Sequence, residues 1–478
     1  MERLGVFISV YGAREVFEML KMYSSRVYST RFYVVSKQYN PIVKRVVEAT
    51  GGEVLVDSSL SLKSHIHMIE KFKDELDIAI CTHEKPIING LRDEIEKRGI
   101  ELYTTFPTSI FALERSKILQ RKLFPEDYNP PWKAFYPRSY PNESELFHDV
   151  KVWVESLGGA CNVVFKPDEP AAGKGVAVGG EHFHTIEDLI LNYVSGFNAP
   201  FIIERREEVE ESSCQLWFDG NIDHISFLRY PEVRDYKRAF EGDLGPNTGG
   251  MGCYMDSSFK LPFMFEEDFE AGYDLARRTI KNIERWAEEN GFDKSGMKPC
   301  MYYLAMAHPH KVFEGNIGRP GDPEDIPPLL SMKNDLLEFY LHLCEGNPER
   351  LDFDLKATVL VYVVPPTYGG KSTIHKDIVL NLPELFELNI DSDKLLIPGD
   401  VEVRADGRLY ARTSRSVAAV ATGGCLEEAA QKAHKLAVYV EDNSDPKGLL
   451  WHRGDIGVKG NVDRSIQHRK ILRERFGF

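Results

Sequence analysis

The stretch "VVFKPDEPAAGKGVAVGG", Val163 to Gly180, has the pattern of a strand that leads into a glycine-rich loop. The strand delivers Lys166, and Gly173, Lys174 and Gly175 follow where bare backbone amides can approach a polyphosphate. The loop is not a Walker A motif, because that motif opens a helix, whereas this turn would feed a second strand. Alone, the pattern fits a structural turn as well as a phosphate-binding loop.

Carboxylates further along the chain add to this pattern. In "FIIERREEVEESS", Glu204 ends an apolar strand whose segment can pair with an adenine edge, and Glu211 follows where it can bond ribose hydroxyls. In "VFEGNIGRPGDPED", Glu314 and Asn316 point to the same side of a strand, because side chains alternate with a period of two. A hard Mg²⁺ ion held between protein oxygens and ATP phosphates needs such a pair. These features together favour a nucleotide site.

The loop "DLGPNTGGMG", Asp243 to Gly252, combines four glycines with one proline and almost no hydrophobic bulk. Such a stretch can neither build a core nor hold a helix, but its bare amides can come close to a ligand. A plain surface loop is the alternative interpretation. The accompanying motifs favour the ligand-binding one.

Three segments of the chain differ in pattern, and together they indicate a multidomain protein of α/β and α+β class. Residues 1–124 alternate short apolar runs with helical patterns, which is typical of a doubly wound parallel sheet, and Gly51 and Gly99 are placed to end helices. Five prolines in "FPEDYNPPWKAFYPRSYPNESE" then indicate a linker. Residues 125–355 group strands, including "HISFLRY", around polar loops, and residues 356–478 form a small α+β domain that ends in a basic surface helix, "RSIQHRKILRERFGF".

Composition excludes several classes of function. The net charge is 59 − 74 = −15 with scattered basic residues, which argues against nucleic-acid or anionic-membrane binding. No apolar stretch reaches the roughly 18 residues of a spanning helix, and the N-terminal apolar run is too brief for a signal peptide. Seven cysteines without a CxxC pair suggest neither a zinc site nor a disulfide framework, so we expect reduced thiols in a cytoplasm.

Several motifs, in order along nearly the whole chain, resemble one family. "IFALERSK" (110–117), "FKPDEPAAGKGV", "RDYKR" (234–238), "GPNTGGMG", "EGN…RPGDPE" and "WHRGDIG" resemble glycinamide ribonucleotide synthetases (phosphoribosylamine–glycine ligases), which are ATP-grasp ligases. The resemblance implies a Rossmann-like pre-ATP-grasp domain, a two-lobed ATP-grasp domain with nucleotide between its lobes, and a C-terminal domain that closes over the acceptor. It also implies that ATP phosphorylates glycine and that 5-phosphoribosylamine attacks the acyl phosphate, in an early step of purine synthesis.

The resemblance implies roles for the matching residues. Lys117 and Lys166 would supply cations to the ATP phosphates, Glu314 and Asn316 would hold Mg²⁺ or Mn²⁺, and Arg319 would lie beside the acyl phosphate or the substrate carboxylate. The strand "CMYYLAMAHPH" lacks the further metal carboxylate that many ATP-grasp enzymes carry, so either Asp322 or Glu324 assists or the site is sparser. The predicted set is Arg319, Lys166, Asn247, Gly249 and Gly250 for catalysis, and Lys117, Lys166, Gly173, Lys174, Gly175, Glu204 and Glu211 for ATP.

The amine site is where this chain departs from the family pattern. "SVYGAREVF" and "THEKP" keep only part of the family's loops, and bulky Tyr11 narrows a backbone approach that glycine would leave open. Lys37, Lys85 or Arg14 can compensate as phosphate ligands, or are ordinary loop residues. The predicted amine-site residues are Gly12, Arg14, Glu84, Asp235, Arg415 and Arg453.

Two alternatives to the leading interpretation stay open. The first is a paralogous ATP-grasp ligase that joins a different amine or amino acid. The second is a non-catalytic nucleotide-binding regulator, which the retention of Lys166, Glu314, Asn316 and Arg319 speaks against. We expect a monomer or a small homo-oligomer that acts on small molecules.

Overall fold

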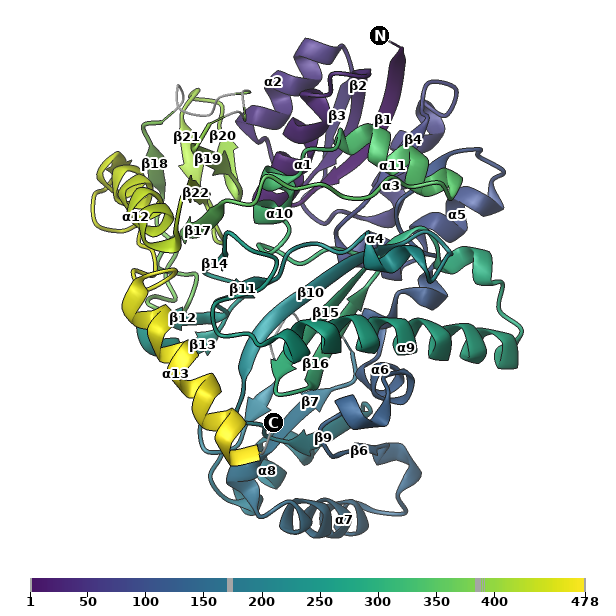
Figure 1. Cartoon of the computed structure of the whole chain (residues 1–478), viewed down its shortest axis with the longest axis vertical. Coiled ribbons are helices and arrows are strands. Elements are labelled where there is room, and N and C mark those ends of the chain that lie inside the picture. Colours follow the sequence, from purple (N-terminus) through teal and green to yellow (C-terminus); the bar gives the residue numbers. More distant parts are fainter. Residues whose placement is uncertain (1, 170–174, 383–387, 389, 391, 477–478) are drawn as a thin grey trace.

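The computed structural model describes residues 2–169, 175–382, 388, 390 and 392–476 (Figure 1). The predicted Gly173 and Lys174 therefore lie outside the described residues. Within the described part of the chain, no helix is both long enough and apolar enough to span a membrane. All seven cysteines are free thiols.

The N-terminal domain is the predicted parallel sheet, with strand order β3-β2-β1-β4-β5. Gly51 adopts a left-handed φ of 69° and ends α2, as its place after the apolar face predicts. Strand order reverses between β1 and β4, so the loops after these strands open a crevice at their carboxyl ends. The elements are β1 (Arg3–Val10), α1 (Ala13–Tyr23), β2 (Ser29–Ser36), α2 (Pro41–Thr50), β3 (Glu53–Val56), α3 (Leu62–Lys71), β4 (Ile78–Ile80), α4 (Glu84–Ile88), α5 (Leu91–Lys97) and β5 (Tyr103–Thr104).

After α6 (Lys117–Leu123), the chain enters a small lobe with its own four-stranded antiparallel sheet, in the order β6-β9-β7-β8. Its core is separate from the others and includes stacked Phe135 and Phe201, with Phe165 against them. A lobe with its own core can move as a rigid body. Its elements are β6 (Trp132–Phe135), α7 (Glu143–Ser156), β7 (Val163–Pro167), β8 (Ala177–Val178), α8 (Ile186–Leu189) and β9 (Phe201–Arg205).

Eight antiparallel strands form the largest sheet, in the order β16-β15-β10-β11-β14-β17-β22-β19. α9 packs on β15, while α12 packs on β17 and β22. The elements of this part are β10 (Glu210–Phe218), β11 (Val233–Asp235), β14 (Gly252–Met255), α9 (Glu266–Asn290), β15 (Cys300–His308), β16 (Lys311–Ile317), α10 (Ile326–Ser331), α11 (Leu336–Glu345), β17 (Ala357–Val363), β19 (Lys394–Pro398), β22 (Val417–Gly423) and α12 (Leu426–Asp442).

Smaller elements complete the C-terminal half. A hairpin stands beside the large sheet, and a second four-stranded sheet, β20-β21-β18-β23, lies next to α12 (Figure 1). The last helix runs from the C-terminal domain down to the small lobe, where the chain ends (Figure 1). These elements are β12 (Arg238–Phe240), β13 (Leu244–Asn247), β18 (Ile378–Leu380), β20 (Val401–Val403), β21 (Leu409–Ala411), β23 (Ser444–Asp445) and α13 (Lys459–Phe476).

Three local expectations differ from the structure. The proline-rich segment is more than a linker, because β6 lies inside it and pairs with β9. Residues 224–230 form no strand, since a short 3₁₀ turn at His224–Ser226 takes their place. The sheet also runs on across the 355/356 boundary through the β14–β17 ladder, so the C-terminal segment shares a sheet with the part before it.

Candidate active site

Three of the predicted ATP and metal residues lie on one face of the large sheet. Glu211 is opposite Ala307, Glu314 is opposite Ala305, and Asn316 is opposite Tyr303. Directly paired residues of antiparallel strands share a face, and so do residues two apart along a strand. Strand pairing therefore brings together carboxylates that are about a hundred residues apart in the sequence.

Nearby cations hold Glu314 in its ionised form. The Nζ atom of Lys237 lies 3.5 Å from its carboxylate. Burial alone would raise the pKa of Glu314, but Lys237, Lys117 and Lys166 outweigh burial and lower it to about 2. The lowered pKa keeps the carboxylate ionised at neutral pH, and its side chain is 35% exposed, so solvent reaches it. Lys237 was not predicted as a site residue, although it stands in the quoted run "RDYKR".

The carboxylate of Glu211 lies at the open rim of this face. Its side chain is exposed to solvent. Desolvation by the surrounding protein nevertheless raises its pKa, despite the nearby charges of Lys237 and Arg234. The contact of Glu211 with ribose hydroxyls stays a prediction.

The side chain of Lys166 is positioned by an ion pair with Glu204. The Glu204 carboxylate is 2% exposed, is paired with Arg121 at 2.8 Å and also contacts Lys166. Burial would raise the pKa of Glu204, but the two cations lower it. The buried Glu204 side chain thus fixes Lys166. The expected pairing of its segment with an adenine edge stays a prediction. Arg121 of α6 also donates to the Phe313 carbonyl at 2.7 Å, so its contacts link β9 of the small lobe to β16.

The strand expected after the glycine-rich stretch is present. It is β8, which pairs antiparallel with β7, while the role of the stretch as a phosphate loop stays a prediction. Gly175 has a φ of 90°, a conformation that side chains disfavour. Lys117 begins α6, and the Asp168 carboxylate at the end of β7 accepts from Ile118 N at 2.8 Å. Lys117 therefore lies next to the end of β7, the strand that carries Lys166.

The loop at 243–252 is packed against two other segments. Arg415 donates to the Gly249 carbonyl at 2.5 Å, and the Tyr368 hydroxyl donates to the Gly250 carbonyl at 3.2 Å. Gly250 has a φ of 109°, and a Cβ there would lie 2.8 Å from Cδ of Pro323. The glycine is thus required by close packing at the edge of the site. Asn247 is exposed in β13.

Arg415 is brought to this site from the C-terminal domain. Its guanidinium pairs with Asp322 at 2.6 Å, and the Tyr362 hydroxyl donates to the same carboxylate at 3.1 Å. Arg453 lies apart from solvent, 1% exposed, and its donors go to Asp455, Asp243 and the Arg238 carbonyl. In this structure the Arg453 guanidinium therefore holds the β12–β13 hairpin.

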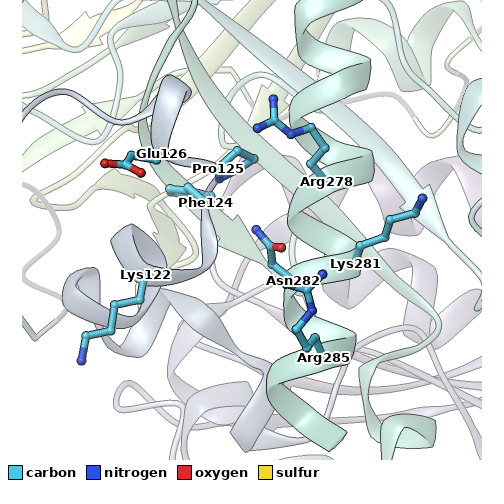
Figure 2. Close-up of a pocket in the computed structure, with 8 residues that line it drawn as sticks. All are labelled: Lys122, Phe124, Pro125, Glu126, Arg278, Lys281, Asn282 and Arg285. Atoms are coloured by element: carbon cyan, nitrogen blue, oxygen red, sulfur yellow. The ribbon is translucent and has the colours of Figure 1, made fainter. Parts of the chain in front are cut away.

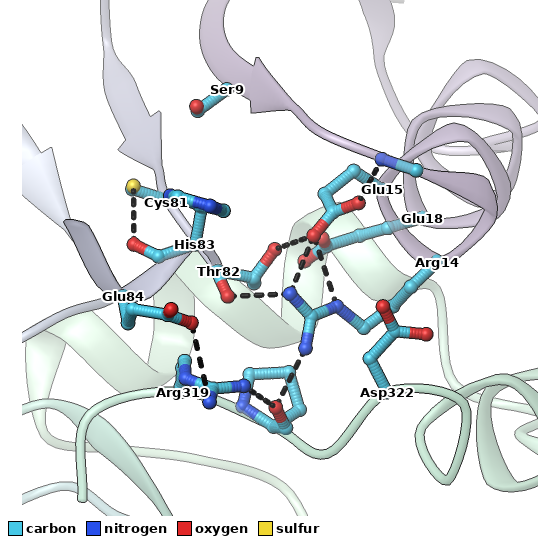
Figure 3. Close-up of polar contacts among 12 residues, drawn as sticks. Ser9, Arg14, Glu15, Glu18, Cys81, Thr82, His83, Glu84, Arg319 and Asp322 are labelled. Carbon is cyan, nitrogen blue, oxygen red and sulfur yellow. Dashed lines mark hydrogen bonds and ion pairs between the residues drawn. The ribbon is translucent and has the colours of Figure 1, made fainter. Parts of the chain in front are cut away.

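Figure 3 shows how the first helix meets the loop after β16. Arg14 is 2% exposed and donates to Glu15, to the Thr82 carbonyl at 2.5 Å and to the Pro320 carbonyl at 2.7 Å. Each guanidinium nitrogen of Arg14 donates to a buried protein acceptor, so in this structure Arg14 is not free to bind a phosphate. Gly12 caps α1 through its N–H, which donates to Glu15 at 2.9 Å.

Arg319 has two acidic partners in the same region. Glu114 holds it through two contacts of 2.7 and 2.6 Å, and Glu84 lies 3.4 Å away. Glu114 was not predicted, although it stands in the quoted "IFALERSK". Asp235 Oδ1 is buried with no hydrogen-bond partner. Burial and then the charge of Glu324 raise the pKa of Asp235 well above its usual range.

The predicted alternatives for phosphate binding are arranged around Tyr11. Lys37 lies 4.4 Å above the Tyr11 ring and pairs with Asp400 at 3.3 Å. The His83 ring is 4.7 Å from the Tyr11 ring on the other strand of the crevice. Lys85 is exposed at the start of α4. Aromatic side chains therefore occupy the crevice entrance where the family pattern has small residues.

The hollow in Figure 2, of about 440 Å³, is a different place. It is lined by α6 and α9 residues such as Lys122, Arg278 and Arg285, and none of the predicted site residues lines it. In the described part of the chain, no cluster of three or more His, Cys, Asp or Glu side chains is arranged to hold a metal ion. Glu314 and Asn316 are two oxygen-bearing side chains on one face, which fits a Mg²⁺ ion that takes its other ligands from phosphates and water.

Comparison with known proteins gives a consistent result. Residues 138–324 match the family model described as the phosphoribosylglycinamide synthetase ATP-grasp (A) domain. The chain is 31% identical to a phosphoribosylamine–glycine ligase of Methanocaldococcus jannaschii over 93% of this chain and 94% of that one. It is 30% identical to the ligase of that name from Methanothermobacter thermautotrophicus, over 92% and 94%. The crystal structure of a Thermotoga maritima phosphoribosylamine–glycine ligase superposes with a TM-score of 0.67 at 20% identity, over 95% of this chain and all of that one.

Proposed function

Because the chain belongs to the phosphoribosylamine–glycine ligase family, we propose how its own residues form glycinamide ribonucleotide from glycine and 5-phosphoribosylamine with ATP. The protein is an ATP-dependent carbon–nitrogen ligase of purine biosynthesis. In the first step, a glycine carboxylate oxygen attacks the γ-phosphorus, and ADP leaves. In the second, the amine nitrogen attacks the acyl carbon, phosphate leaves and the nitrogen loses a proton. An acyl phosphate makes the carboxylate attackable by splitting one high barrier into two.

The observation that carries this proposal is the group of lysines near Glu314. Lys237 lies 3.5 Å from its carboxylate, Lys166 donates to the adjacent Phe313 carbonyl at 3.5 Å, and the charge of Lys117 also lowers the pKa of Glu314. A transferring phosphoryl group spreads negative charge over its oxygens, and fixed cations stabilise it without reorganising. We assign Lys117 and Lys166 to the ATP phosphates and Lys237 to the transferring group. Glu211 lies at the rim, where ribose hydroxyls would reach it.

Glu314 and Asn316 would hold the divalent cation, which supplies charge neutralisation of the phosphate oxygens when bound. Both are on the same face of the large sheet. Tyr303 and Ala305 occupy the facing strand β15, so no second carboxylate comes from there. Glu324 is engaged by the Tyr303 hydroxyl at 2.7 Å, which makes it a poor substitute. We therefore propose a sparse site in which Lys237 provides part of the positive charge.

The amine would enter the crevice after β1 and β4, near Tyr11 and Glu84 and near the pair of Asp322 with Arg415. The charges of Arg415, Asp400, Asp322 and Glu84 all act on Tyr11. Arg319 would release its longer contact, the one of 3.4 Å to Glu84, when a substrate carboxylate or acyl phosphate arrives. Glu84 would then be free to bond the amine.

The aromatic entrance of this crevice favours one second candidate, a ligase of the same chemistry with a different amine. Tyr11, His83 and Lys37 replace an open glycine turn, so the phosphate of the amine would meet side chains and not backbone amides. The free thiols and the substrates fit a cytoplasmic enzyme, which we also propose.

One assay tests these assignments. Purified protein is given ATP, Mg²⁺ and glycine, with and without freshly generated 5-phosphoribosylamine, and ADP release is measured. Release that requires glycine and 5-phosphoribosylamine supports the proposal. Release only with another amine favours the second candidate, and nucleotide binding without turnover would refute both.

A further inference from the structure

Ion pairs join the end of α13 to the segment that connects the small lobe with the large sheet. That segment, residues 206–209, follows β9 of the small lobe and leads directly into β10. Arg475 donates to Glu208 at 2.5 Å, and His468 contacts Glu208 at 3.3 Å. His468 also bonds Glu210, the first residue of β10, at 2.7 Å. Side chains of α13 therefore hold the connecting segment through ion pairs with Glu208 and Glu210.

The grip is anchored to the rigid part of the molecule. Arg469 of α13 pairs with Asp268 of α9 at 2.6 Å, and both side chains are 0% exposed. Asp268 is also within 3.4 Å of His308 at the end of β15. A buried charge pair of this kind is costly to separate, so α13 is fixed to α9 and β15. Figure 1 shows the helix lying along this side of the molecule as far as the small lobe.

The gripped residues are next to the nucleotide site on both sides. Before the segment, Glu204 of β9 holds Lys166, and after it Glu211 lies at the rim of the sheet face. Glu210 is bonded in addition to Arg234, which begins the run that carries Lys237. Hinges of lobe closure are a few residues at the ends of elements. Residues 206–209, between β9 and β10, have that position.

We propose that His468 and Arg475 are positioning residues that hold residues 206–209 in the conformation from which the small lobe closes on ATP. The inference rests on the proposed function, because it assigns the helix a part in binding that nucleotide. Releasing the segment adds conformations that must be ordered when nucleotide binds, which weakens binding without touching the reacting atoms. The step affected is therefore ATP binding and not chemistry.

The chain supplies matched controls for the test. Arg473 is on the same helix and pairs with Glu267 of α9 at 2.8 Å, so it grips the large lobe and not the connecting segment. Glu208→Gln and Arg475→Ala are compared with Glu267→Gln and Arg473→Ala. We expect KM for ATP to rise about fivefold in the first two, with kcat and KM for glycine within about twofold of wild type. Both controls should leave all three constants unchanged, and Arg475→Lys should restore KM.

A binding measurement separates failure of this inference from failure of the proposed function. ATP affinity is measured by calorimetry, and hydrogen exchange of residues 206–209 is followed in the same proteins. Faster exchange and weaker ATP binding only in Glu208→Gln and Arg475→Ala support the inference. If wild-type protein binds ATP and turns over while these two variants match their controls, the inference is overturned alone. Wild-type protein that binds no ATP overturns the proposed function.

Discussion

Replacing Glu314 by Gln tests the electrostatic design of the site most directly. The pKa of Glu314 falls from 4.5 to about 2 because nearby lysines stabilise its ionised form. At 1.36 kcal/mol per pKa unit, that difference corresponds to about 3.4 kcal/mol of favourable interaction with the ionised form. The side chain is 35% exposed, so solvent screening reduces the amount we expect to measure to about 1–2 kcal/mol.

The sign of the effect follows from linkage. A carboxylate whose pKa is lowered by folding stabilises the native state above pH 4.5, and that stabilisation is lost as pH falls toward 2. Glu314→Gln should therefore destabilise the protein without nucleotide at pH 7, where its lysines are left to repel one another. The variant should lose nearly all ADP release. It should still bind ATP, because the triphosphate supplies the missing negative charge.

Thermal unfolding with and without ATP, together with ADP release, measures these effects. The stabilisation by ATP should be larger in Glu314→Gln than in wild type. Glu288→Gln serves as a control, because Glu288 forms an exposed pair with Lys294 at the end of α9. Near-normal turnover in Glu314→Gln, or unfolding that matches wild type at both pH 7 and pH 3, would refute the reasoning.

Three further changes have defined outcomes. Gly250→Ala should lower kcat at least tenfold, as measured by ADP release, because its φ of 109° and the contact with Pro323 force the loop to move. Wild-type rates would show that the loop accommodates a Cβ atom without loss of activity. Arg14→Met should destabilise the folded protein by about 3–5 kcal/mol in denaturant unfolding, because it leaves buried Glu15 without its cation. Adding Glu15→Gln should recover part of the loss, and an Arg14→Met variant as stable as wild type would contradict the buried pairing. Burial raises the pKa of Glu18 to about 7, so the contribution of this acid to native-state stability declines as pH rises from 4.5 to 7. Glu18→Gln should stabilise the folded protein by about 1–3 kcal/mol at pH 8 but not at pH 4, and an equal effect at both pH values would exclude the pKa shift.

The placements that the sequence predicted correctly are those that follow from local pattern. Glu314 and Asn316 share a sheet face because a strand alternates its side chains, and Gly175 has the left-handed backbone of a tight turn. The contacts that the sequence did not predict are those whose partners lie far away in the chain. Arg14 is occupied by carbonyls from Thr82 and Pro320, and no spacing in its own motif indicates that.

Missed residues show the same limit. Lys237 and Glu114 stand inside quoted motifs, yet only the folded chain places one beside Glu314 and the other beside Arg319. A charge in a sequence has no partner until packing assigns one. The altered N-terminal loops likewise showed that the amine site differs, while the contacts among Tyr11, His83 and Lys37 required coordinates.

The sequence by itself determined the family, the parallel sheet of the N-terminal domain and most of the strands, because these depend on hydrophobic period and on motifs that are local in the chain. Only the tertiary structure decided that the large sheet crosses from the ATP-grasp part into the C-terminal part, and that the last helix returns to the small lobe. Both depend on contacts between segments that are about a hundred or more residues apart. Such contacts are chosen by the packing of the whole chain, and no local pattern records them.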